Sequence, residues 1–211
     1  YYHGEEVVVE ATANQGYEFY TWLEGETPIP EAGAEYTFTI TSNRNLTAQF
    51  NTKFYTLTFD TAGGSPIEPM TLAYGTPVTA PEAPTKDGYT FDGWDPVLPA
   101  TMPAEDLTVV AQWTALPSHT VTFDANGGDG AMAPQTANVP TALTANAFTY
   151  TGYTFQGWNT AADGSGTAYA DEAVYDFAAD VTLYAQWTAN TYTITYNAGP
   201  GGSISGETSQ T

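Results

Sequence analysis

Few residues of this chain have side chains that could catalyse a reaction. The two histidines, His3 and His119, could act as acids or bases, and the chain contains no cysteine. Both histidines fall at the start of a predicted strand. No serine or aspartate recurs beside them in a pattern that would form a nucleophile–base relay. We therefore predict that the protein is not an enzyme and has no catalytic residue.

One glycine-rich segment resembles a metal site. Residues 124–130 read Asp-Ala-Asn-Gly-Gly-Asp-Gly, as in a calcium-binding loop. The segment lacks the alternating oxygen ligands and the terminal bidentate glutamate that such a loop uses. Asn-Gly and Asp-Gly pairs are also typical of tight turns. We interpret the segment as a turn and predict no metal ligand and no cofactor.

The charge of the chain limits its partners. It has 24 Asp and Glu against 3 Lys and Arg, a formal net charge of -21. Such a surface repels nucleic acid and anionic lipid. A hydrophobic fraction of 42% excludes a disordered acidic tail. No apolar run reaches the length of a membrane span, so direct membrane insertion is not expected. The chain starts without methionine or a signal segment, and we expect it to be part of a longer protein.

Three phrases recur along the sequence. The phrase Gly-Tyr-x-Phe-x-x-Trp occurs at Gly16, Tyr17, Phe19 and Trp22, at Gly88, Tyr89, Phe91 and Trp94, and at Gly152, Tyr153, Phe155 and Trp158. A closing phrase ends in Gln-Phe at residue 50 and in Gln-Trp at Trp113 and Trp187. Opening phrases at 55–60, 120–124 and 192–196 start about 64 and then about 73 residues apart. These spacings indicate a tandem array of small domains.

The repeated phrases predict strands. In the opening phrase Tyr55, Leu57 and Phe59 alternate with polar residues, and the closing phrases alternate likewise, which is the period of a β-strand. Glycine-rich turns should follow each opening strand. Helix is scarce: the best candidate is 171–179, and 102–106 holds the equivalent place in the preceding module. We predict a mainly β (α+β) fold with at most a short helix in each module.

The recurrent rings have two possible roles. Identical spacing in every module is what a shared core requires, so we predict that the repeated glycines and aromatic residues are structural. Alternatively, exposed aromatic rings could stack on sugars. For that role Tyr150, Tyr169 and Tyr175, which are specific to one module, are the better surface candidates.

The phrases divide the chain into four parts. We predict a module at 1–51 that lacks its first strand, complete modules at 52–114 and 115–188, and the first strand and turn of a further module at 189–211. The linkers are very short, which favours an elongated, moderately stiff rod. The tail is either the result of a cut within a longer array or a strand donated to the next subunit. We favour the cut.

These motifs resemble a known family. Residues 120–128, 152–158 and 183–187 are similar to the Listeria–Bacteroides repeat, also called the internalin-type B repeat, and residues 57–60, 88–94 and 111–113 match it as well. Residues 1–50 resemble its divergent version. The resemblance implies small β-grasp (ubiquitin-like) modules in tandem on prokaryotic surface proteins, without enzymatic activity or cofactor.

Three functions follow as expectations. We favour a non-catalytic extracellular stalk or spacer, or an adhesin segment, at the cell surface or cell wall. The first alternative is a filament or surface-layer subunit joined head to tail when the 191–211 tail completes the first module. The second is a glycan-binding module. Expected partners are other repeats of the same or a neighbouring chain, and a protein or glycan of a host or neighbouring cell.

Overall fold

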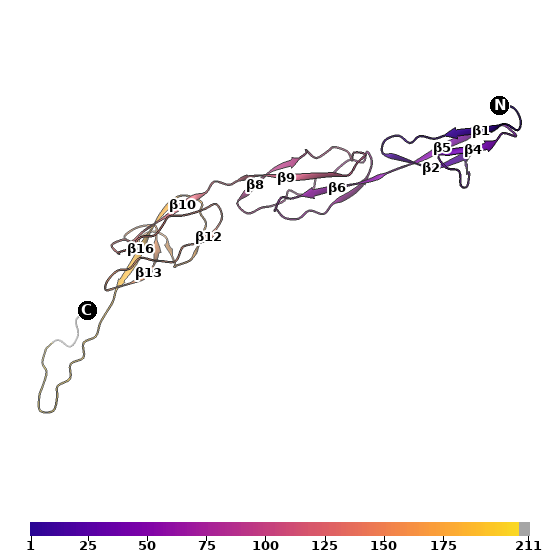
Figure 1. The fold of residues 1–211 in the computed structure, drawn as a ribbon. Helices are drawn as coiled ribbons and strands as arrows, with labels where there is room; N and C mark the ends of the chain where they lie inside the picture. Colours follow the sequence, from indigo (N-terminus) through magenta and orange to yellow (C-terminus); the bar gives the residue numbers. More distant parts are fainter. Residues whose placement is uncertain (207–211) are drawn as a thin grey trace. The chain divides into compact units, whose positions relative to one another are not determined.

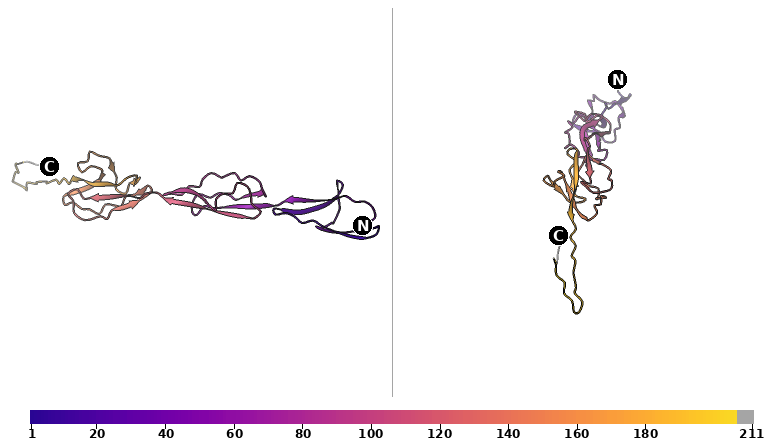
Figure 2. Two further views of the ribbon diagram at one scale, coloured as in Figure 1. Left: turned by 90° about the horizontal axis from the view of Figure 1, so that it is seen from above. Right: turned by 90° about the vertical axis from the view of Figure 1, so that its left-hand side faces the viewer.

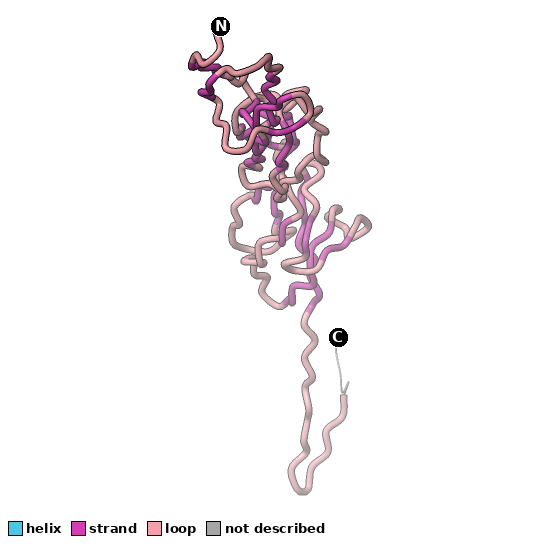
Figure 3. Tube along the Cα trace, turned by 90° about the vertical axis from the view of Figure 1, so that its right-hand side faces the viewer, coloured by secondary structure: helices cyan, strands magenta, loops and turns pink. Residues whose placement is uncertain are grey.

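The computed structural model describes residues 1–206, which form a mainly β protein (Figure 1). The chain divides into two compact units, Tyr1–Ala115 and Leu116–Thr211. We call residues 1–53, 54–115 and 119–189 the first, second and third repeat. Over residues 1–206 no helix is present, and hence none that could cross a membrane (Figure 3).

The first repeat contains two small sheets. Strand β1 (Glu6–Glu10) pairs antiparallel with β4 (Glu35–Thr39). The second sheet has the order β3-β2-β5, with β3 at Thr27–Pro28, β2 at Tyr17–Glu24 and β5 at Leu46–Thr52. The long β2–β5 hairpin carries the first Gly-Tyr-x-Phe-x-x-Trp phrase and the first closing phrase.

The second repeat forms one four-stranded sheet in the order β7-β6-β9-β8. Its strands are β6 (Phe54–Asp60), β7 (Met70–Ala73), β8 (Tyr89–Asp95) and β9 (Leu107–Ala115). The first strand, β6, pairs in parallel with the last, β9, with Leu57 opposite Leu107. The opening and closing phrases therefore meet at the centre of the sheet.

The third repeat has the same plan with additional strands. Its main sheet has the order β11-β10-β16-β13-β14, and β12 (Thr141–Ala142) pairs separately with β15 (Val174–Tyr175). The main-sheet strands are β10 (His119–Asp124), β11 (Gln135–Ala137), β13 (Tyr153–Asn159), β14 (Ala168–Tyr169) and β16 (Val181–Ala189). Again the first and last strands, β10 and β16, are parallel neighbours.

The predicted alternation of the opening strands determines which side chains enter the core. In β6, Leu57 is fully buried and Phe59 nearly so, whereas Thr58 between them is exposed. Val121 and Phe123 occupy the equivalent buried positions of β10. The second and third repeats each have their own cluster of buried apolar residues. Each of these repeats thus has a separate interior.

The glycine-rich turns after the opening strands have the geometry that Asn-Gly favours. The Gly64 N–H donates to the Thr61 carbonyl, while Ala62 and Gly63 both have positive φ, at 47° and 87°. In the third repeat Asn126, with φ at 49°, takes the place of Ala62. Two successive positive φ values define a type I′ turn, which matches the twist of a hairpin.

Neither of the two helix candidates forms a helix. Within 171–179 the chain makes a turn, then the short strand β15, and Glu172 and Phe177 have positive φ at 57° and 52°. Right-handed helix cannot accommodate such residues. Residues 102–106 are irregular as well: Met102 is buried, and its N–H donates to the Thr76 carbonyl. Packing against neighbouring segments thus outweighs the weak local helix preference.

The tail forms no strand within its described part. Residues 190–206 leave the third repeat without a strand, as the yellow end of the ribbon shows in Figure 2. The chain reverses near Gly199, whose carbonyl accepts the Gly202 N–H. We predicted the first strand of a further module here. The opening strands β6 and β10 each have two partner strands, and the described tail has none. Residues 207–211 lie outside the described part of the chain.

Candidate functional site

Each Gly-Tyr-x-Phe-x-x-Trp phrase covers a β-bulge. The strand pairings of β2, β8 and β13 shift register between the Phe position and the residue two places later, that is between Phe91 and Gly93 in the second repeat. In a regular strand residues three apart point to opposite faces. The extra residue of the bulge returns Trp94 to the face of Phe91, and their ring centroids lie 5.2 Å apart.

The other two repeats use the same arrangement. The centroids of Phe155 and Trp158 are 5.0 Å apart, and those of Phe19 and Trp22 are 6.0 Å apart. Trp158 and Trp22 are buried, while Trp94 and the three phenylalanines are half-buried. The two-residue gap between Phe and Trp is therefore the length that a bulge requires to bring both rings into one cluster.

The closing tryptophans connect the sheet to the glycine turn. The Trp113 indole N–H donates to the Thr61 carbonyl at 3.0 Å, and Trp187 donates to the Ala125 carbonyl at 2.9 Å. Both rings lie so close to the turn that a Cβ on Gly64 or Gly128 would overlap them. Both tryptophans are half-buried. The second glycine of each turn is thus required by a side chain about 50 to 60 residues away.

The repeated tyrosines do not lie in the core. Tyr17, Tyr89 and Tyr153 are 39%, 41% and 40% exposed. Each is the first residue of its strand and pairs with the end of the closing strand, beyond the buried cluster. We had expected a core position from their invariant spacing. The equal spacing shows only that the three tyrosines occupy equivalent positions in their repeats. These positions lie at the end of the sheet.

One predicted surface residue is buried instead. Tyr175 is only 9% exposed, because it packs between Tyr169 and Phe177 with ring centroids 5.3 Å away in both cases. Burial raises the pKa of its phenol. Tyr169 is half-buried, and Tyr150 stacks on Tyr153 at 4.1 Å. Among the three candidates for a sugar-stacking surface, only Tyr150 belongs to a pair with an exposed ring.

The calcium-like segment is a hydrogen-bonded turn. The Asp124 carboxylate accepts the Asn126 N–H at 2.8 Å. The Asn126 side-chain amide donates to the carbonyls of Ala162 and Ala185. The Asn126 side chain therefore fastens the turn to the closing strand and to the loop after β13.

Acidic residues directly before two closing strands accept backbone hydrogen bonds that the sequence did not predict. The Asp106 carboxylate, directly before β9, accepts the Thr56 N–H at 2.7 Å, and Asp180, directly before β16, accepts the Thr120 N–H at 2.8 Å. His119 lies near Asp180, with Nδ1 3.5 Å from Oδ1. An acid immediately before the second and third closing phrases was the sequence feature that could have revealed this role.

Lys53, in the linker between the first and second repeats, forms backbone hydrogen bonds with both repeats. The Lys53 N–H donates to the Gly16 carbonyl, and the Lys53 carbonyl accepts the Tyr74 N–H, both at 2.9 Å. The Tyr74 ring meets Tyr17 edge-on at 5.8 Å and covers Gly16, where a Cβ would overlap it. The glycine of the first phrase therefore gives room for a residue of the following repeat.

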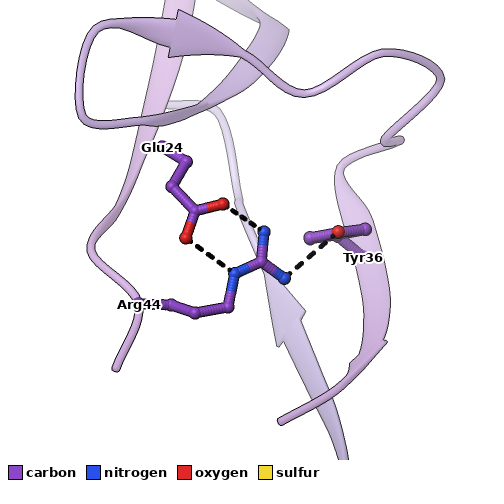
Figure 4. A network of polar contacts seen from close by, with 3 residues as sticks. All are labelled: Glu24, Tyr36 and Arg44. Carbon is purple, nitrogen blue, oxygen red and sulfur yellow. Dashed lines mark hydrogen bonds and ion pairs between the residues drawn. The ribbon is translucent and has the colours of Figure 1, made fainter. Parts of the chain in front are cut away.

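The chain's single arginine forms the one polar cluster of the first repeat that includes an ion pair (Figure 4). Two Arg44 nitrogens donate to the Glu24 carboxylate at 2.9 and 2.7 Å, and a third donates to the Tyr36 hydroxyl at 3.3 Å. The guanidinium also lies 4.4 Å from the centroid of the Phe38 ring. The hydrogen bonds from Arg44 lower the pKa of the Glu24 carboxyl.

The family comparison agrees with the repeat structure. The model of the Listeria–Bacteroides repeat domain matches residues 55–96 and 119–186, and that of the divergent InlB B-repeat domain matches residues 1–54. These ranges contain all three Gly-Tyr-x-Phe-x-x-Trp phrases.

Similar curated proteins come from two bacteria. Internalin H of Listeria monocytogenes is 39% identical over 66% of this chain, which covers 26% of that protein. Two Evansella cellulosilytica proteins named as candidate membrane proteins, one of them Gly-rich, are 31% and 28% identical over 87% and 90% of this chain. The chain covers 28% and 23% of their lengths. It thus spans about a quarter of the relatives that it matches.

Proposed function

Because this chain belongs to the Listeria–Bacteroides repeat family, with a divergent InlB B-repeat domain at its N-terminal end, we propose that it is a non-catalytic spacer in a prokaryotic cell-surface protein. The spacer would project a binding domain from the envelope or contribute weak adhesion. The names of the relatives, an internalin and two candidate membrane proteins, support a place at the cell envelope. A binding partner would be a protein or glycan of a host or neighbouring cell.

We further assign the second and third repeats to the β-grasp class. In that class the first and last strands are parallel neighbours at the centre of a mixed sheet. The order β7-β6-β9-β8 has this property, and so does β11-β10-β16-β13-β14. The crossover that usually carries a helix is irregular in both repeats.

The parallel pairing of first and last strands carries the proposal. The chain enters the second repeat at the start of β6 and leaves it at the end of β9. Because β6 and β9 run in the same direction, the chain enters and leaves this repeat at opposite ends of its central strand pair. A pulling force applied to the two ends of the repeat therefore acts on all the hydrogen bonds between β6 and β9 at the same time, in shear.

The contacts within and between repeats support a structural role. The indole N–H groups and the strand-end carboxylates bind backbone groups of their own repeat. The two hydrogen bonds of Lys53 and the Tyr74 ring on Gly16 stiffen the first linker. Both features support a structural role for the repeats.

Single-molecule pulling tests the spacer function. The chain has no cysteine, so handles can be attached to introduced cysteines in the second repeat. Phe54→Cys with Ala115→Cys applies force to the ends and should require a several-fold higher force than Phe54→Cys with Ala73→Cys. The second pair peels the β6–β7 hairpin one bond at a time, since Phe54 faces Ala73.

The end-to-end pulling should also release a chain length on the order of 200 Å in one step. Equal forces for the two attachment pairs would remove the mechanical argument for a load-bearing spacer. Gradual extension without a distinct step would do the same.

A glycan-binding role is the second candidate, and the exposed tyrosine pair supports it. Tyr150 and Tyr153 stack with an interplanar angle of 15°, and Tyr153 is 40% exposed. Flat aromatic surfaces of this kind can pack against sugar rings. If the protein binds sugars there, a glycan array should give signals that Tyr153→Ala removes and Tyr20→Ala, another exposed tyrosine, leaves intact. Silence on the array would exclude this role.

A further inference from the structure

An open hollow lies where the first repeat passes into the second, within the compact unit Tyr1–Ala115. Its volume of about 630 Å³ is in the range of small-ligand sites in proteins. The residues that line it, which we call the linker hollow, are Glu18, Asn51, Thr52, Lys53 and Phe54. Glu18 and Asn51 are cross-strand partners in β2 and β5, and the backbone of Lys53 is hydrogen-bonded to both repeats. The backbone that carries these side chains is therefore held in place.

The polar side chains of the linker hollow are available to a ligand. Among residues 1–206, the carboxylate of Glu18, the amide of Asn51 and the ammonium of Lys53 have no hydrogen-bond or ion-pair partner. The other two cations of the chain differ in this respect, because Arg44 and Lys86 both donate to groups of their own repeat. Lys53 is thus the lysine whose charged group the described part of the chain leaves unused.

Phe54 adds an exposed aromatic ring to the hollow. Its side chain is 69% exposed, and its partner in the neighbouring strand is the small residue Ala73. Ser118 has the equivalent position in the third repeat. Phe54 and Ser118 each lie three residues before the residue opposite the start of the closing strand, Leu57 or Val121. The fold therefore does not require a ring at this position.

The same end of the hairpin is open in the second repeat. Thr90 pairs with Thr114 there, as Glu18 pairs with Asn51 in the first repeat. Both threonines are exposed, although β9 has β6 as its neighbour on the other side. The exposure of Glu18 and Asn51 therefore does not depend on whether an opening strand lies beside β5. What distinguishes the linker hollow is the chemistry of its side chains.

These side chains match the surface of a neutral sugar. A carboxylate accepts hydrogen bonds, an ammonium donates them and an amide does both, while each sugar hydroxyl can take either role. The apolar face of a sugar ring can pack against an aromatic ring. One carboxylate and one ammonium leave the hollow without net charge. The remainder of this molecule, with its formal charge of -21, would repel an anionic ligand, and an apolar ligand would cover both charged groups without giving them partners.

We propose that the linker hollow binds a neutral sugar residue of an oligosaccharide. The Phe54 ring lies against one face of the sugar, and the three polar side chains bind its hydroxyl groups. This inference goes beyond the spacer function, which does not need it. It also concerns a site other than the stacked pair of Tyr150 and Tyr153.

An array of neutral and anionic oligosaccharides, probed with the full chain, tests the ligand class. Neutral sugars should bind, and calorimetric titration of the best one should show that Phe54→Ala weakens binding at least about tenfold, because one covered face of the sugar is lost. Val97→Ala, at an 83% exposed residue outside the hollow, is the control and should change nothing. Binding of anionic sugars alone, or equal effects of the two substitutions, would overturn the proposal.

Substitutions of the charged groups test the polar contacts. Glu18→Gln and Lys53→Met each remove one charge, and Lys53→Met keeps the backbone hydrogen bonds of the linker. Each should weaken the neutral sugar several-fold, whereas Lys53→Arg should retain most of the affinity. Glu82→Gln, at an exposed acid of the second repeat outside the hollow, is the matched control. Unchanged affinity in both Glu18→Gln and Lys53→Met would contradict the assigned contacts.

A further substitution separates this site from the tyrosine pair. Tyr153→Ala should leave the sugar bound, and the amide signals of residues 18 and 51–54 should shift during an NMR titration. Loss of binding in Tyr153→Ala but not in Phe54→Ala would keep a glycan-binding role and overturn the linker site. An array on which no neutral sugar binds would overturn it as well, while the spacer function would stand.

Discussion

At the scale of single residues, the close approach of a tryptophan to a glycine holds the ends of each complete repeat together. The Trp113 ring covers Gly64 while its indole N–H binds the Thr61 carbonyl, and Trp187 does the same at Gly128. The two residues are far apart in sequence, and both the glycine and the ring are needed. Their recurrence in the array has a steric cause.

We expect Gly64→Ala to destabilise the second repeat by about 1–3 kcal/mol, because its Cβ would overlap the Trp113 ring. The neighbouring Gly63→Ala is the control. Gly63 has a φ of 87°, and the atoms nearest to its Cβ would be at 3.7 Å, so only backbone strain of about 1–2 kcal/mol opposes it. Urea titration measures both. A Gly64→Ala variant as stable as the parent would contradict the close approach.

A second prediction concerns pH. The hydrogen bonds from Arg44 lower the pKa of Glu24 in the folded state below the unfolded value. A group with a lowered folded pKa contributes stability above its unfolded pKa and loses it as pH falls through the folded pKa. Between pH 6 and the acid range, at about pH 3, the parent should therefore lose more stability in its first repeat than Glu24→Gln. Identical acid profiles of the two proteins would show that the ion pair contributes nothing.

At the scale of the strand, the β-bulge is what converts the phrase Gly-Tyr-x-Phe-x-x-Trp into a cluster of rings. It lies at Gly93 in the second repeat and at Gly157 in the third, with φ of 127° and 137°. Thr21 takes this place in the first repeat and has no positive φ. The bulge can thus be built in two ways, and only one of them requires glycine.

We therefore expect Gly157→Ala to be more harmful than Gly93→Ala. Both substitutions place a side chain at positive φ, which costs about 1–2 kcal/mol. At Gly157 the Cβ would also lie 2.7 Å from the Tyr169 carbonyl oxygen, while nothing lies within 4 Å at Gly93. Thermal unfolding should show a clearly larger loss for the third repeat. If the two repeats lost the same stability, the contact with β14 would be irrelevant to the bulge.

The sequence was sufficient to predict the strands but not the conformation of the loops. Strict alternation in 55–60 and 181–187 predicted β6 and β16, and the mainly β fold is confirmed. The helix expected at 171–179 failed because its acids and alanines favour a helix only locally, whereas β12 and the Tyr169 ring bind that segment. The division into four parts and the structural role of the repeated rings stay predictions.

For the site residues, type and spacing did not reveal exposure. Tyr17 and Trp22 recur equally well, yet one is 39% and the other 7% exposed. The difference in exposure depends on which residues lie at the end of the sheet. A single phrase does not show where the sheet ends. The pairing of Asp106 with Thr56 was likewise hidden, because it joins residues 50 positions apart.

At the scale of the whole molecule, the closing strands of the second and third repeats, β9 and β16, each have a partner strand on both sides. These repeats bury the alanines that pair with Trp94 and Trp158 almost completely, as Ala111 and Ala185 show at 3% and 0% exposure. The tandem family and the parallel first and last strands fit repeats that each fold as a unit. The function of the molecule then depends on each repeat being a self-contained fold.

The unfolding of the third repeat in isolation tests that claim most directly. A fragment of residues 116–190 contains Trp158 and Trp187, and their fluorescence reports on its core. The account predicts one cooperative transition, with a midpoint within a few degrees of the transition that the same tryptophans report in the full chain. A fragment that is unfolded at room temperature, or one whose tryptophans are fully exposed to quencher while folded, would contradict it.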